Sequence, residues 1–410
     1  MLKRISSLDF AHFKPAAQKI CSLSIPIVII NVTKHISYFI TMIMIAQLGH
    51  AYVAAGALIN AVIITAMIPL FCFFHAVSAV VGQHYGARRY TEIGKTLRQS
   101  MLLGALISLP LMVILRYVGH VLIFFGQDPY LSMIAEEYFR SFAWGVSLPF
   151  FSVCITEFFI SIGKQKLSLM FSIFETILLV ALGYILVFGK FGVKAFGLKG
   201  AGYAINAANA INLILIIAVL FFDKAYERYR IFEFCKKDKL LYVKEVAKIG
   251  WPIACMAGGE LMIIAMAIML YGWLGEASLA AQNITMRLNV LAFMIAQGIG
   301  QAAMVLISQE IGAKKYNLIR NMGYSAMILG VLASLLVLFI YSIAYKPLIG
   351  LFLDLSSPIA QNTFKVTTLL LILHGILNVI DFPRFVAVFA LRGLRDTVVP
   401  MLIFVGLGCA

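Results

Sequence analysis

Three polar side chains in one apolar run have the spacing of a cation site. His374, Asn378 and Asp381 follow one another at i, i+4 and i+7, so a helix would place them on one face. Pro383 removes a backbone donor beside Asp381, which frees a carbonyl oxygen as a further ligand. A proton and Na+ are alternative ways to neutralise such a carboxylate. We therefore expect Asp381 to bind H+ or Na+, although an ion pair with Arg384, three residues on, is a competing interpretation.

A second acid lies inside another apolar run. Glu260 is the sole ionisable residue between Ile249 and Leu274, a stretch long enough to cross a bilayer as a helix. A charge at that depth costs roughly 2.5–3.5 kcal/mol, so such an acid is usually paired, protonated or engaged with an ion. Gly258 and Gly259 directly precede it and would let another helix or a ligand approach. Glu260 is predicted to lie on an ion or substrate path, and a structural ion pair is the alternative.

Other polar side chains within apolar runs are candidates for additional ion or substrate contacts. Each of these residues also has a structural explanation that competes with ion or substrate contact. Glu157 could make a local polar contact, Arg287 could be a counter-ion, and His374 could be a packing residue. The additional candidates are Lys34, Glu157, Glu175, Arg287, His374 and Asn378.

The composition is that of a multi-span membrane protein. Hydrophobic residues make up 62% and charged residues 12% of the 410 positions, and the mean hydropathy is +0.96. The net charge of +15 is no argument for a nucleic-acid partner, because basic residues flank membrane spans. The six cysteines show no disulfide or metal spacing, and no nucleotide-hydrolysing motif is present. His374 and Asp381 alone are too sparse for an enzyme site, so we expect no enzymatic activity and no cofactor.

Apolar runs separated by polar loops predict eleven spanning helices. The amino-terminal segment and the loops after the even-numbered spans carry most of the Lys and Arg residues, which places the amino terminus in the cytoplasm. Eleven is an odd number, and the last run ends at Ala410, so we expect a twelfth helix beyond this chain. The predicted spans are 20–46, 54–81, 98–124, 138–162, 168–189, 199–222, 249–273, 279–307, 321–346, 364–391 and 397 onward.

The two halves of the chain repeat each other at an offset of 226 residues. This offset aligns LGHAYVAAGAL (48–58) with LGEASLAAQNI (274–284), and GQHYGARRY (82–90) with SQEIGAKKY (308–316). Six helices per half is an even number, so the halves would have the same orientation in the membrane. The predicted fold is all-α, with two six-helix lobes related by pseudo-two-fold symmetry. The lobes are residues 1–222 and 249–410, and a basic cytoplasmic linker, 223–248, joins them.

The offset also aligns Lys34 with Glu260. An axis along the membrane normal would place these two residues at the same depth. A buried cation and a buried anion at one depth would lower the cost of desolvation for each other. We expect the two charges to interact, and the alternatives for Lys34 are a lipid interface or another acid such as Glu157.

The paired motifs resemble those of the multidrug and toxic compound extrusion (MATE) transporters, in their NorM-like branch. The resemblance covers essentially the whole chain. It departs from that branch where Thr41 replaces an acid and where Leu179 and Gly183 replace an Asn pair, and Glu175 lies on the same face as these two. Further matching stretches are YILVFGKFG (184–192), GLKGAGYA (197–204) and LRGLRDTVVP (391–400).

The resemblance implies a monomeric antiporter of the bacterial inner membrane. Such a protein exports a small organic cation or toxic metabolite in exchange for Na+ or H+, by alternating access between its lobes. The acids that match the ion-binding positions of that branch are Glu260 and Asp381. Membrane lipids are the surrounding partners, and no nucleotide takes part. The alternative is a flippase for lipid-linked precursors, because Lys34, Arg140, Arg287 and Arg384 are cations within spans.

Overall fold

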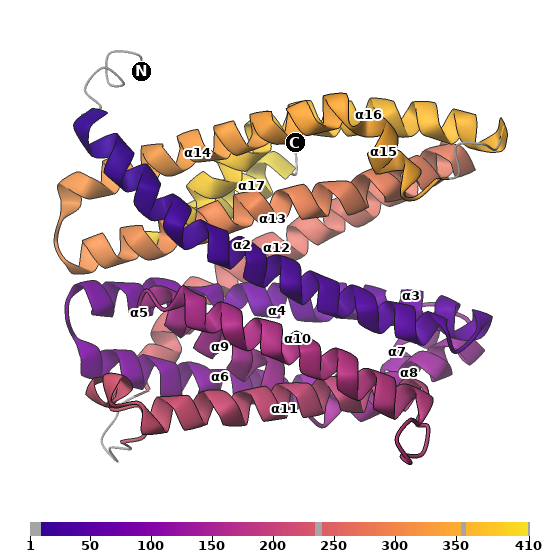
Figure 1. The fold of residues 1–410 in the computed structure, drawn as a ribbon, viewed down its shortest axis with the longest axis horizontal. Helices are drawn as coiled ribbons and strands as arrows, with labels where there is room; N and C mark the ends of the chain where they lie inside the picture. The colour runs from indigo at the N-terminus through magenta and orange to yellow at the C-terminus, as the bar shows by residue number, and fades with distance from the viewer. Residues whose placement is uncertain (1–9, 234–239, 354–357, 409–410) are drawn as a thin grey trace. The chain divides into compact units, whose positions relative to one another are not determined.

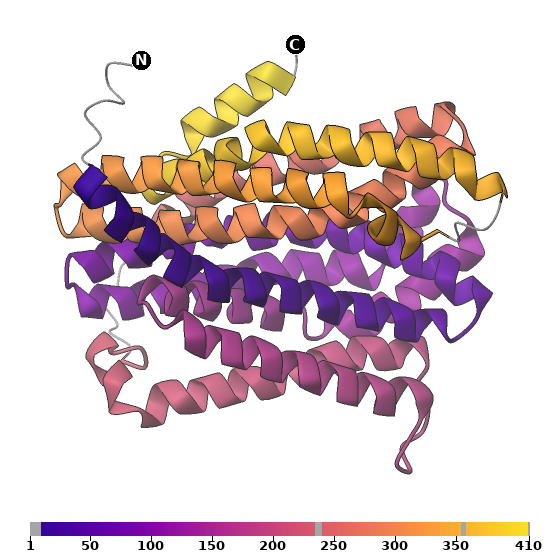
Figure 2. The same cartoon turned by 45° about the horizontal axis from the view of Figure 1, so that its top comes forward.

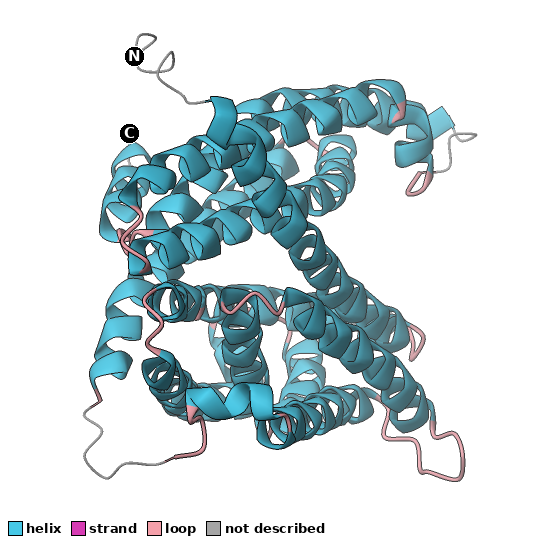
Figure 3. Ribbon diagram, turned by 60° about the vertical axis from the view of Figure 1, so that its left-hand side comes forward, coloured by secondary structure: helices cyan, strands magenta, loops and turns pink. Residues whose placement is uncertain are grey.

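All regular secondary structure in the computed structural model is helical. The structure describes residues 10–233, 240–353 and 358–408, and these contain no strand (Figure 3). Within this described part, nine helices are long and apolar enough to cross a membrane, and a bent helix pair makes a tenth candidate. The eleventh predicted run forms α17 (Val398–Gly408), which has 11 residues. The expectation of an all-α polytopic membrane protein is thereby confirmed.

The chain divides into two compact units, which we call the N unit and the C unit. The N unit is Ile29–Ala257, and the C unit is Met1–Val28 together with Gly258–Ala410. Two long helices, α2 (Phe10–Ala46) and α12 (Leu241–Trp273), contain the boundaries between the units. Each unit is described separately below.

The other helices of the N unit follow the predicted spans. The helices α10 and α11 pack side by side (Figure 2), and Gly200 on α11 permits this because a Cβ there would lie 2.5 Å from the Leu186 carbonyl oxygen. The elements are α3 (His50–Val62), η1 (Ile63–Met67), α4 (Ile68–Phe73), α5 (His75–Gly86), α6 (Tyr90–Arg116), α7 (Val118–Phe124), α8 (Pro129–Ala143), α9 (Ser147–Ser161), α10 (Gln165–Phe188), α11 (Leu198–Phe222) and η2 (Lys224–Tyr229).

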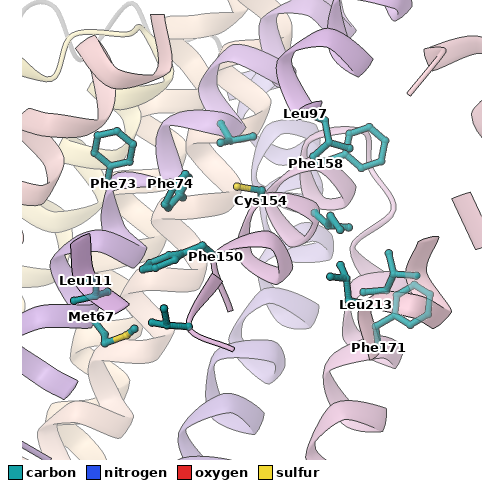
Figure 4. Packing of buried hydrophobic residues seen from close by; sticks show 14 of the residues in the cluster. Met67, Phe73, Phe74, Leu97, Leu111, Phe150, Cys154, Phe158, Phe171 and Leu213 are labelled. Carbon is teal, nitrogen blue, oxygen red and sulfur yellow. The ribbon is translucent and has the colours of Figure 1, made fainter. Parts of the chain in front are cut away.

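Three predicted spans of the N unit are interrupted. The run 98–124 is divided at Tyr117 into α6 and α7. The run 54–81 contains η1, a π-helical turn just before Pro69, because proline lacks an N–H and its ring would collide with the preceding turn. The run 138–162 is split into α8 and α9, whose axes differ by 57°. Buried aromatic side chains fill the core beside these breaks, and the rings of Phe74 and Phe150 lie 5.6 Å apart (Figure 4).

Three long helices form the body of the C unit. They are α13 (Glu276–Gly312), α14 (Tyr316–Ile343) and α16 (Pro358–Gly393), and they run side by side (Figure 1). A short helix, α15 (Tyr345–Gly350), follows α14. Close packing of α16 on α13 requires Gly393, because a Cβ there would lie 2.7 Å from the Met304 carbonyl oxygen.

The sequence repeat is also a repeat of backbone conformation. Gly49 and Gly275 precede α3 and α13 with φ of 133° and 99°, and they are 226 positions apart. Arg88 and Lys314, at the same offset, adopt the left-handed conformation with φ of 58° and 60° in the turns after α5 and α13. These tight turns are therefore built alike in the two halves.

Candidate ion site

Asp381 lies at the surface of the C unit and forms an ion pair with Arg384 on the same helix, α16. Phe382 is fully buried, with its ring 5.8 Å from that of Phe293 on α13, and this contact fixes the rotation of α16. Asp381 lies on a different face, where its Oδ1 accepts a hydrogen bond of 2.9 Å from Nε of Arg384. The pair that the sequence offered as a competing interpretation is thus formed. The helix continues through Pro383, which donates no hydrogen bond to the preceding turn.

Arg384 also faces the second predicted acid. Its Nη1 lies 4.0 Å from Oε1 of Glu260 on α12, so one guanidinium lies between two carboxylates. The side chains of Glu260, Asp381 and Arg384 are 33%, 45% and 44% exposed, so all three remain accessible. Gly259 beside Glu260 permits close approach of Phe404 from α17, since a Cβ there would lie 2.7 Å from that ring. We call Glu260, Asp381 and Arg384 the acid–arginine cluster.

The cluster carries two negative charges and one positive charge. In this arrangement the guanidinium compensates part of the carboxylate charge that a bound cation would otherwise neutralise. A cation that enters between the carboxylates would therefore compete with Arg384. In the described part of the chain, no group of three or more His, Cys, Asp or Glu side chains has the arrangement of a metal site. Any ion held here would use these two carboxylates with other oxygen atoms.

The structure brings together only part of the predicted face of α16. The side chain of His374 bonds within its own helix, with Nδ1 2.9 Å from the Leu370 carbonyl oxygen. Asn378 is buried, and its Nδ2 donates a hydrogen bond of 2.8 Å to Oδ1 of Asn289 on α13. Arg287 is exposed on α13 and forms no ion pair with a residue that the structure describes. The roles proposed for His374, Asn378 and Arg287 in ion or substrate contact stay predictions.

Glu175 and Lys34 are neighbours within the N unit. The Glu175 carboxylate accepts a hydrogen bond of 3.1 Å from Nδ2 of the buried Asn212 on α11. Lys34 on α2 lies near enough for its charge to stabilise the Glu175 carboxylate. Next to this pair, the hydroxyl groups of Ser37 and Thr176 are 2.6 Å apart and join α2 to α10. Lys34 therefore has an acidic neighbour in its own unit, and the interaction with Glu260 stays a prediction.

Glu157 forms a pair that the sequence did not reveal. Its Oε1 lies 2.8 Å from Nδ1 of His75, and the side chains of Glu157 and His75 are only 3% and 13% exposed. This contact agrees with the local polar role that competed with ion coupling for Glu157. His75, Asn212 and Asn289 were missed as partners, although each is a polar residue in an apolar run and thus carried a signal.

Comparison with known proteins decides the family. The family model described as MatE matches residues 26–185 and again residues 252–407. The chain belongs to the MatE family. The two matches begin 226 positions apart, which is the offset of the repeat, so the MatE model recognises both halves.

The relatives of this MatE protein carry NorM names. It is 29% identical over 385 residues to the probable multidrug resistance protein NorM of Mesorhizobium japonicum, covering 93% of this chain and 82% of that protein. The probable NorM of Brucella suis is 27% identical over 381 residues, covering 92% and 81%. The chain is thus a NorM-like member of a transporter family, as its motifs implied.

Solved MATE structures have the same fold. The eukaryotic MATE transporter AtDTX14 is similar with a TM-score of 0.82 and 19% identity, covering 96% of this chain and 86% of that one. The Vibrio cholerae MATE transporter VcmN in its bent form gives a TM-score of 0.84 at 18% identity, covering 96% and 87%. These likenesses, together with the nine apolar helices of the described residues, establish a multi-pass membrane protein of the MATE fold.

Proposed function

We propose that this protein is a secondary active efflux antiporter that exchanges an organic cation or toxic metabolite for Na+ or H+. The observation that carries the proposal is the acid–arginine cluster, in which one cation, Arg384, lies between two carboxylates on different helices. The names of the relatives, probable multidrug resistance proteins, support the class of substrate. The same relatives support a location in the bacterial inner membrane, and the basic loops support a cytoplasmic amino terminus.

The acid–arginine cluster suggests how ion binding would shift the equilibrium between the conformational states of the transporter. A Na+ ion or a proton that neutralises Glu260 or Asp381 weakens the hold of Arg384 on both acids. An ion shifts a conformational equilibrium only as far as its affinities for the two states differ, and displacement of Arg384 supplies such a difference. Each transported proton makes available about 1.4 kcal/mol per pH unit, and each transported charge makes available about 2.3 kcal/mol per 100 mV.

The flippase alternative is less well supported by the contacts of the in-span cations. Arg384 lies between two acids, Arg140 contacts Glu136 at 2.6 Å, and Lys34 lies near Glu175. A cavity for lipid-linked phosphates would instead need cations whose charge is still available to the ligand. Two of the four candidate cations are therefore paired with carboxylates, and a third, Lys34, lies near one.

The test is gradient-driven transport of a fluorescent organic cation in proteoliposomes. A Na+ gradient and a pH gradient are imposed in separate experiments on the wild type and on Asp381→Asn, Glu260→Gln and Glu276→Gln. We expect one gradient to drive transport by the wild type and by Glu276→Gln, because Glu276 is exposed at the start of α13 and forms no ion pair within the described residues. Asp381→Asn should lose this transport, and Glu260→Gln should lose most of its dependence on the ion.

The outcome that contradicts the proposal is equally specific. Asparagine keeps the shape and the acceptor oxygen of Asp381 but removes its charge. If Asp381→Asn inserts, purifies as a single species and still transports at the wild-type rate under the effective gradient, then Asp381 does not carry the coupling ion. If neither gradient moves any organic cation in the wild type, the class of transporter itself is wrong.

A further inference from the structure

A basic cavity lies at one end of the helices of the N unit. Its volume is about 650 Å³, and its lining includes four arginines, Arg88, Arg89, Arg228 and Arg230, with Glu92 and Tyr242. Arg88 and Arg89 belong to the turn between α5 and α6, whereas Arg228 and Arg230 come from η2 and the residue that follows it. Segments far apart in the sequence thus contribute guanidinium groups to one cavity.

Specific contacts hold these segments in place. Arg98 on α6 donates hydrogen bonds of 2.7 Å and 3.1 Å to the carbonyl oxygens of Arg230 and Ile231. Gly94 on α6 lies directly against η2, because a Cβ there would be 2.0 Å from the Tyr229 carbonyl oxygen. On the other side, the Tyr242 hydroxyl donates a hydrogen bond of 2.5 Å to Glu92. The walls of the cavity are therefore built by packing and do not depend on loosely placed loops.

The arginine charge in the cavity is largely uncompensated. Arg88, Arg89 and Arg228 form no ion pair with a carboxylate that the structure describes, and Arg230 has only the exposed Glu233 at 3.4 Å. The one acid in the lining, Glu92, is already bonded to Lys95 at 3.2 Å. Four positive charges in one cavity repel one another, so a bound anion would stabilise the arrangement.

Aromatic rings orient one of these guanidinium groups. The Arg228 guanidinium lies 4.8 Å from the ring centroid of Tyr90 and 5.0 Å from that of Tyr229, and it donates a hydrogen bond of 3.0 Å to the Tyr229 hydroxyl. Burial raises the pKa of the Tyr229 phenol to about 12, so the ring stays neutral near pH 7 and does not cancel the arginine charge. An arginine held flat in this way has less freedom to lose when it binds an anion.

We propose that this cavity binds a phosphate group, carried by an anionic phospholipid head group or by a soluble phosphate compound. Guanidinium groups bind phosphate oxygens through paired, charge-assisted hydrogen bonds, and Arg88, Arg89 and Arg228 are available for them. The cavity lies beside the ends of three apolar helices, His50–Gly86, Tyr90–Arg116 and Leu241–Trp273. Because these helices are long and apolar enough to span a membrane, we expect the cavity at the depth of lipid head groups. The site is separate from the acid–arginine cluster and does not depend on the proposed transport function.

The repeat supplies a matched control for the test. Arg88→Asn/Arg89→Gln removes two charges from the cavity, and asparagine suits the left-handed conformation at position 88. Lys314→Asn/Lys315→Gln removes two charges from the equivalent turn of the C unit, which has the same backbone conformation but does not line the cavity. All four side chains are exposed, so both double variants should fold.

The full chain is purified with neutral lipid and given two probes in separate arms. Native mass spectrometry measures bound phosphatidylglycerol, and calorimetry measures binding of inorganic phosphate. We expect wild type and the Lys314/Lys315 control to bind at least one probe with equal affinity. The Arg88/Arg89 variant should bind that probe about 30-fold more weakly, which is about fivefold for each charge near a membrane surface.

The two arms identify the source of the phosphate. Binding of the lipid alone assigns a head-group site, binding of phosphate alone assigns a soluble ligand, and binding of both with mutual competition assigns their common chemistry. The proposal is overturned if wild type binds neither probe. It is also overturned if the two double variants lose affinity equally, because the effect would then come from general charge at the membrane surface.

Discussion

Arg384 is the residue on which the candidate ion site depends. It is paired with Asp381 at 2.9 Å and lies 4.0 Å from Glu260, so it takes the position of a counter-ion for both acids. The side chains of Asp381 and Arg384 are 45% and 44% exposed, so packing does not enclose their contact. A transported cation could therefore reach the carboxylates and displace Arg384 in every cycle.

We therefore predict that Arg384→Gln makes the coupling ion bind more tightly and leave more slowly. The ion concentration for half-maximal transport should fall, because the ion no longer competes with the guanidinium for the two carboxylates, and the maximal rate should fall as well. Initial rates measured against ion concentration in proteoliposomes give both quantities. Arg320→Gln, which removes an exposed arginine of α14, should leave both unchanged. An unchanged half-maximal concentration in Arg384→Gln would show that Arg384 does not compete with the ion.

At the residue scale, the sequence predicted which polar residues lie within the apolar helices better than it predicted which residues they contact. Asp381 and Arg384 are three residues apart on one helix, so their pairing followed from helix geometry alone. The contact of Glu260 with Arg384 joins α12 to α16 and depends on how both helices are rotated in the packed unit. Hydropathy and spacing within a single helix contain no information about that rotation. The partnership of Glu157 with His75 was missed for the same reason.

At the scale of elements, glycines decide how closely neighbouring helices approach. Gly94 lies where α6 meets η2, and a Cβ would come within 2.0 Å of a backbone oxygen that has no flexible side chain to move aside. Gly323 on α14 offers a contrast, because nothing lies within 4 Å of its Cβ position. One glycine is required by packing, and the other is merely tolerated.

These two glycines should respond in opposite directions to the same substitution. Gly94→Ala should lower the free energy of unfolding by about 1–3 kcal/mol, because η2 must shift away from α6. Gly323→Ala should leave it unchanged or raise it by up to about 1 kcal/mol, because alanine restricts the unfolded chain and favours a helix. Thermal unfolding of the purified variants measures both effects. A melting temperature of Gly94→Ala equal to that of the wild type would mean that η2 does not pack as described.

The sequence predicted where helices lie better than where they break. Every predicted span contains helix, since long apolar runs are a strong signal. The π-helical turn before Pro69 and the 57° bend between α8 and α9 were not foreseen. Both breaks lie inside continuous apolar sequence, where hydropathy does not change. The breaks are caused by the missing N–H and the ring of proline and by side-chain packing, which a hydropathy profile does not record.

At the scale of the whole molecule, the sequence repeat could be recognised because similar residues occupy the equivalent turns of both halves. Gly49 and Gly275 adopt positive φ, and Arg88 and Lys314 share the left-handed conformation at the same offset. The MatE family model matches both halves at that offset. Two copies of one fold nevertheless carry different polar groups. The acid–arginine cluster belongs to the C unit alone, and the basic cavity belongs to the N unit alone.

The central claim is that export of an organic cation and entry of Na+ or H+ are one coupled process. Coupling between two ligands is reciprocal, so a gradient of the organic cation must be able to drive the ion. The most direct measurement loads proteoliposomes with a cationic dye, imposes no ion gradient, and follows ion movement as the dye leaves. We predict that dye exit drives entry of Na+ or of protons in the wild type, and that Glu260→Gln/Asp381→Asn abolishes it. Dye exit without ion entry in the wild type, or equal ion entry in the double variant, would contradict the account.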